Sequence, residues 1–114
     1  MPRAIYSMTR TREEIIAERQ RLKSEYRELF DEVAALLFRH DSVGINFEDN
    51  ADEYEPEVET ILPRLGGCHS ADDVRRVVHQ EFVRWFDSGI AGPEDHYGKI
   101  AIEIWERWQR FKAT

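Results

Sequence analysis

The sequence predicts an all-α fold: a four-helix, mainly antiparallel bundle with a long first helix and an acidic, irregular connection after it. Three observations predict this fold. Apolar residues recur at three- and four-residue steps in four stretches, Gly, Pro and Asp/Asn-rich turns separate these stretches, and the short connections favour antiparallel neighbours. The 114 residues have room for one domain, so we expect a flexible N-terminal arm at 1–10 and a single helical domain at 11–114.

One long helix is expected from about residue 11 to about residue 39. Thr11 and Glu14 have the spacing of a capping box, in which each side chain bonds the other residue's backbone N–H. The first half of this helix is thinly apolar, whereas the second half ends in a dense apolar run. We therefore expect the second half to lie in the core and residues 11–25 to project or to pack against another chain in a homodimer. The expected apolar stripe is Ile15, Leu22, Tyr26, Leu29, Val33 and Leu36.

Three further helices follow from local signals. The second is expected to begin near Glu55 with Pro56 as its first helical residue, and Pro63 is expected to kink or end it. Ser70 is the expected N-cap of the third helix, which Ser88-Gly89 should stop. The fourth is expected to start at Pro93.

The fourth helix carries a strong apolar stripe and two pairs of opposite charges. We expect Glu103 to pair with Arg107, and Glu106 with Arg110, because residues four apart are neighbours on a helix surface. The same periodicity places the three tryptophans in the core rather than in a cofactor site. These tryptophans are Trp85, Trp105 and Trp108.

The net charge of −7 is concentrated in one segment, residues 39–60, since the acids and bases of the flanking regions cancel. Such a block repels nucleic acids and anionic lipids and attracts cations or a basic protein surface. A solvated loop without a partner is the alternative interpretation. Arg39 is the one lysine or arginine of this segment. Its acids are Asp41, Glu48, Asp49, Asp52, Glu53, Glu55, Glu57 and Glu59.

Motifs for catalysis and cofactor binding are mostly absent, and we predict no catalytic residue, no cofactor and no metal. Glycine-rich nucleotide-binding patterns do not occur. Calcium-loop patterns starting at Asp41 or Asp49 place unsuitable residues at ligand positions. An alternative function remains open: a small metal-binding protein or hydrolase using His40, Asp41 and nearby carboxylates. Cys68 beside His69 fits a residue in a turn better than a nucleophile.

No apolar run is long enough for a membrane span, and the first residues lead into no apolar signal region. The single cysteine excludes an intramolecular disulfide framework and suits a reducing compartment. We therefore expect a cytoplasmic protein.

Residues 41–46 (Asp-Ser-Val-Gly-Ile-Asn) and residues 52–58 (Asp-Glu-Tyr-Glu-Pro-Glu-Val) resemble a small bacterial helical family of unknown function. Its members carry an Asp-Pro-Ile-Gly motif and then an Asp-Glu-Tyr-Asp/Glu motif leading into a helix. Here Ser42 stands in place of the usual proline. The resemblance implies a helical fold and a defined role for this loop. Related small proteins are suspected of being immunity proteins encoded beside toxin genes, and no catalytic residue is transferred.

The charge pattern and the resemblance together predict a non-enzymatic protein that binds a basic protein, a toxin being one candidate, through residues 41–59. A structural interpretation of the motif stands beside this prediction: Asp52 caps the second helix and Tyr54 packs its ring. The predicted binding residues are Asp41, Glu48, Asp49, Asp52, Glu53, Tyr54 and Glu55.

Overall fold

The computed structural model describes residues 11–40 and 54–113, and within these ranges the chain is helical without a strand. This confirms the all-α class. The expected arm at 1–10 and most of the acidic connection lie outside the described residues. The elements, in order, are α1 (Arg12–Tyr26), α2 (Glu28–His40), α3 (Glu55–Ile61), the 3₁₀ helix η3 (Leu62–Gly67), α4 (Ala71–Phe86), α5 (Ser88–Ala91), the 3₁₀ helix η4 (Glu94–Tyr97) and α6 (Gly98–Ala113).

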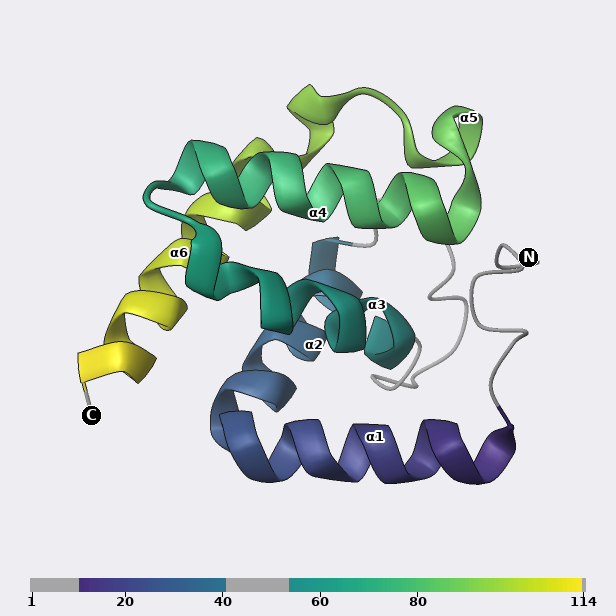
Figure 1. Ribbon diagram of the computed structural model, residues 1–114. Helices are drawn as coiled ribbons and strands as arrows, with labels where there is room; N and C mark the ends of the chain where they lie inside the picture. Colours follow the sequence, from purple (N-terminus) through teal and green to yellow (C-terminus); the bar gives the residue numbers. More distant parts are fainter. Residues whose placement is uncertain (1–10, 41–53, 114) are drawn as a thin grey trace.

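The expected long first helix is instead two helices, so the prediction of four helices with a long first member is wrong. The capping box at its start is present: Thr11 Oγ1 accepts the Glu14 N–H at 3.1 Å, and Glu14 Oε1 accepts the Thr11 N–H at 3.0 Å. The break falls at Arg27, whose φ of 53° ends α1, and α2 turns sharply away from the axis of α1 (Figure 1). No glycine or proline lies at the break, so the sequence carries no local signal for it.

The second predicted helix is confirmed as α3, with Pro56 in its first turn. It changes to the 3₁₀ helix η3 at Leu62, one residue before Pro63. Proline has no N–H to donate and its ring clashes with the preceding turn, so it favours a change of helix type here. Tyr54 occupies the N-cap position, but its side chain makes no capping hydrogen bond, and the expected cap, Asp52, lies outside the described residues.

The third helix is confirmed as α4: its N-cap is Ser70, whose Oγ accepts the Asp73 N–H at 3.2 Å. It ends at Phe86, and the expected stop at Ser88-Gly89 is a further short helix, α5. The fourth predicted helix starts later than Pro93. The turn η4 follows this proline, and α6 begins at Gly98.

The core lies around α4, which packs most extensively against α6 and also contacts α3 and α5. Phe82 is the aromatic centre, with its ring centroid 5.9 Å from that of Tyr54 and 5.2 Å from that of Tyr97. Trp85 and Trp108 are buried, as predicted, whereas Trp105 is only partly buried.

Helix α1 lies at the edge of the molecule (Figure 1) and contributes one buried side chain, Leu22. The prediction that the second half of the 11–39 region is the core half is confirmed by the buried residues of α2. Packing of residues 11–25 against a second copy stays a prediction. Among the described helices, none combines the length and apolar character needed to cross a bilayer.

Candidate functional site

The structure places only the end of the predicted binding segment. Tyr54 and Glu55 are described, and both are buried. The Tyr54 ring packs on Phe82 in the core, in agreement with the structural interpretation of the motif. The remaining predicted binding residues lie outside the described residues: Asp41, Glu48, Asp49, Asp52 and Glu53.

The acids of α3 face the chain itself, through an ion-pair network with α1. Arg19 Nη2 lies 2.6 Å from Glu59 Oε2, and Arg19 Nη1 lies 3.5 Å from Glu55 Oε1. Lys23 Nζ lies 3.3 Å from Glu55 Oε2. The Glu59 side chain is 1% exposed and that of Glu55 is 9% exposed, so solvent screens these charges less than it screens surface pairs.

Matched spacing explains this network. Arg19 and Lys23 are four residues apart on α1, and Glu55 and Glu59 are four residues apart on α3, so each pair occupies one helix face. Glu57, between the two acids, is also buried. The acids of α3 are therefore largely withdrawn from the outer surface, in contrast to the expectation that the whole 41–59 segment faces outward.

His40, the first residue of the alternative metal or hydrolase site, pairs with α6. Its Nε2 lies 2.6 Å from Glu103 Oε2, while Arg39 Nη2 donates to Glu103 Oε1 at 2.7 Å. The hydrogen bond from His40, together with the charges of His40, Arg39 and Arg107, lowers the pKa of Glu103 against the opposing effect of burial. Asp41 lies outside the described residues, and among those described no three His, Cys, Asp or Glu side chains gather as metal ligands.

This arrangement corrects the predicted surface pairs of α6. Glu103 pairs with α2 instead of Arg107, because the C-terminal end of α2 brings two basic side chains to it. Among the ion pairs of the described residues, Glu106 and Arg110 do not form one either.

Cys68 is a buried thiol, 5% exposed, whose Sγ lies 3.6 Å from the Arg64 carbonyl oxygen. Burial raises its pKa, which disfavours the nucleophilic thiolate. The neighbouring His69 donates its backbone N–H to Asp73 Oδ2 at 2.8 Å. This geometry favours the structural interpretation of the Cys68-His69 pair.

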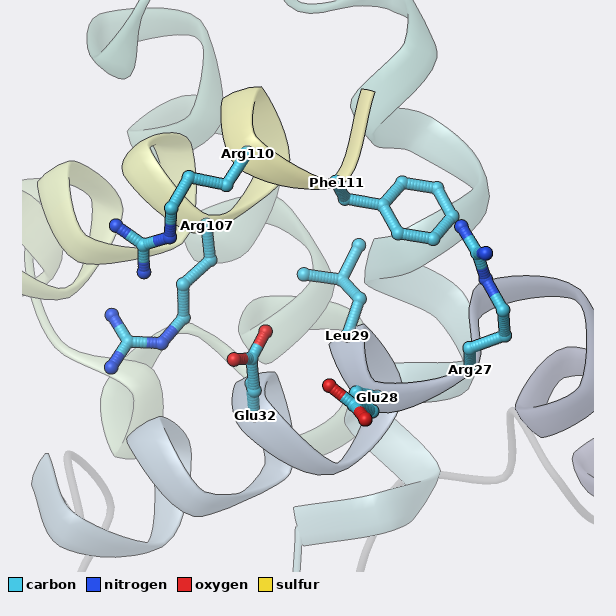
Figure 2. A pocket seen from close by; sticks show the side chains of 7 residues that line it. All are labelled: Arg27, Glu28, Leu29, Glu32, Arg107, Arg110 and Phe111. Atoms are coloured by element: carbon cyan, nitrogen blue, oxygen red, sulfur yellow. The ribbon is translucent and has the colours of Figure 1, made fainter. Parts of the chain in front are cut away.

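A cleft that the sequence does not predict lies between the start of α2 and the end of α6 (Figure 2). Its volume is about 320 Å³. We call it the arginine cleft. Arg107, Arg110 and Phe111 fall on neighbouring positions of one helix, which is a weak signal, but nothing local assigns α2 as the opposite wall. The lining residues are Arg27, Glu28, Leu29, Glu32, Arg107, Arg110 and Phe111.

In the part of the chain that the structure describes, the protein is all-helical. No family model, curated protein or solved structure matches the chain. The resemblance of residues 41–58 to a small helical family stays a prediction. Arguments about function therefore depend on charge, burial and geometry.

Proposed function

We propose that this chain is a non-enzymatic binding protein that recognises a basic protein through residues 41–53, here called the acidic connection. The observation that carries the proposal is the difference between its acids and those of α3. Glu55 and Glu59 already have basic partners on α1. The acidic connection holds five acids and no lysine or arginine.

Electrostatics makes a basic protein surface the best partner. Most of the net charge of −7 comes from the acidic connection. Concentrated charge of one sign steers an oppositely charged protein and accelerates association, and this effect weakens as salt is added. The same charge repels nucleic acids, whose recognition depends on lysine and arginine contacts to phosphate.

The residues that flank the acidic connection have partners on the helices. On one side, His40 and Arg39 bind Glu103. On the other side, Tyr54 is fully buried and Glu55 is paired with Lys23. The acidic connection therefore starts and ends at residues that are attached to the helices, which supports a role in recognition.

A basic toxin is the specific partner we propose. The likeness of residues 41–58 to a family with suspected immunity proteins supports this choice. An immunity protein acts by occupying its toxin, so it needs a complementary surface and no catalytic group. The charge of the acidic connection supplies such a surface.

The test is calorimetric titration of the full chain against the basic proteins encoded beside its gene. We expect one of them to bind, with affinity that falls as salt is raised. A variant neutralised in the acidic connection should bind at least about tenfold more weakly, because several charge contacts are removed together. This variant carries Glu48→Gln, Asp49→Asn, Asp52→Asn and Glu53→Gln.

A matched control removes the same number of acids elsewhere and should bind like the parent protein. Its exposed positions lie on four different helical elements. Equal weakening in both variants would mean that partner binding depends on the net charge of the chain and not on the acidic connection. Unchanged affinity in the variant neutralised in the acidic connection would refute the proposal. The control carries Glu13→Gln, Asp31→Asn, Asp95→Asn and Glu106→Gln.

A further inference from the structure

The arginine cleft combines a cationic end with an apolar wall. Figure 2 shows the guanidinium groups of Arg107 and Arg110 side by side at one end of the cleft, and the Phe111 ring at the other. Leu29 lies between them. These side chains come from two helices far apart in the sequence, so the cleft exists only in the folded chain.

At the cationic end, one guanidinium nitrogen lacks an acceptor. Arg107 Nε is buried and has no hydrogen-bond partner among the residues that the structure describes. The acid expected to pair with Arg107, Glu103, is held by Arg39 and His40. A buried donor without an acceptor is unfavourable, and Arg107 lines the cleft, so the Arg107 guanidinium is the group to which we assign an anionic ligand.

The apolar wall is held rigidly. The Arg27 guanidinium lies 4.9 Å from the centroid of the Phe111 ring, and the rings of Trp108 and Tyr26 lie 5.7 Å and 5.9 Å from it. Arg27 reaches this position from a backbone with φ of 53°. Such strained conformations concentrate at functional sites, and a fixed ring binds a ligand with little loss of entropy.

Charge and size narrow the ligand class. Three arginines and two glutamates line the cleft, so a single negative charge balances it better than a polyphosphate does. The guanidinium fork matches a carboxylate in two parallel hydrogen bonds. A volume of about 320 Å³ lies at the small end of ligand pockets. We propose that the arginine cleft binds a small organic monocarboxylate with an apolar body.

The glutamates refine this assignment. Glu28 and Glu32 line the cleft from α2, and Figure 2 shows the Glu32 carboxylate pointing toward α6. As carboxylates they accept hydrogen bonds and repel a second negative charge. A hydroxyl or ammonium group on the ligand is therefore favoured next to α2, with the ligand carboxylate next to Arg107 and Arg110.

The test is a titration of the full chain with 3-phenylpropanoate, followed by nuclear magnetic resonance. Its neutral analogue, 3-phenylpropanamide, has the same shape without the charge, and phenyl phosphate carries more charge. We expect saturable binding of the carboxylate at one site and at least about tenfold weaker binding of the amide, because charged hydrogen bonds are roughly twice as strong as neutral ones. The phosphate should also bind more weakly than the carboxylate.

Two variants locate the site. Arg107→Gln should weaken carboxylate binding at least about tenfold, whereas the matched control Arg12→Gln, an exposed arginine on α1, should bind like the parent. Phe111→Leu should weaken the carboxylate and the amide alike. Circular dichroism verifies that each variant is folded.

Three results would overturn the inference: no saturable binding of the carboxylate, equal affinity for the amide, or parent-like binding by Arg107→Gln. The inference is independent of the proposed function. The variant neutralised in the acidic connection should bind 3-phenylpropanoate like the parent, even if it no longer binds the basic protein.

Discussion

Asp87 adopts a backbone conformation that L residues rarely occupy, with φ of 84° and ψ of 167°. This region is essentially restricted to glycine and is strained for other residues. The side chain offsets the strain, since Asp87 Oδ1 accepts the Ile90 N–H at 2.8 Å and so caps α5. One residue thus ends α4 and starts the next helix.

We predict that Asp87→Ala lowers the free energy of unfolding by about 1–2 kcal/mol, because it removes the cap and keeps the strain. Asp87→Gly removes the cap but relieves the strain, so its effect should be close to zero. Urea unfolding of both variants measures the difference. Equal destabilisation by alanine and glycine would show that backbone strain at this position contributes nothing.

At the scale of elements, charged side chains join helices that apolar packing alone joins weakly. Helix α1 buries only Leu22, yet Arg19 and Lys23 fix it to α3. Similarly, the fully buried Glu81 of α4 receives Arg64 from η3 at 2.7 Å. Removing one member of a buried pair leaves an uncompensated charge. These contacts therefore favour one arrangement of the paired helices over others.

The contact between α2 and α6 gives a pH-dependent prediction. The pKa of Glu103 is lowered in the folded chain, so its ionised form stabilises the fold above its unfolded pKa of about 4.3. This stabilisation is lost as the pH falls through the lower, folded pKa. Glu103→Gln should therefore reduce the free energy of unfolding near neutral pH, by about 0.5–1 kcal/mol for a pair at the surface.

Thermal unfolding of the parent and Glu103→Gln over a series of pH values measures this effect. The difference between the two proteins should shrink below about pH 4, where the carboxylate becomes protonated. Glu106→Gln serves as the control and should show no such trend. Glu106 is an exposed acid three residues after Glu103 on α6. A difference independent of pH would contradict an ionic origin.

At the scale of the whole molecule, stability is unevenly distributed. Helix α4 is the centre of the core and packs on α6, and its buried face includes Phe82 and Trp85. Helix α1 lies at the edge (Figure 1) and depends on ion pairs. Local opening follows the amount of apolar surface that an element buries.

We therefore predict that amide hydrogen exchange is slowest in α4 and α6 and fastest in α1 among the described long helices. Added salt should speed the exchange of α1 further, because the exposed parts of its ion pairs are screened, and should leave α4 nearly unchanged. Exchange measured by mass spectrometry at two salt concentrations tests this. Equal protection of α1 and α4 would mean that the molecule opens only as a unit.

The helical class and several helix limits could be predicted from the sequence, because they depend on local interactions. The capping box at Thr11, the N-cap at Ser70 and Pro56 in the first turn of α3 were predictable from neighbouring residues. The same holds for the burial of Trp85 and Trp108, which follows from helical periodicity.

The pairing of distant side chains could not be predicted, because it depends on how the helices pack in three dimensions. The expected long helix is broken at Arg27, the acids of α3 pair with Arg19 and Lys23, and Glu103 pairs with Arg39 and His40. Local preferences for a continuous helix or a surface pair amount to tenths of a kcal/mol, and the burial of whole helix faces outweighs them. The arginine cleft likewise depends on helix packing, because residues from both α2 and α6 line it.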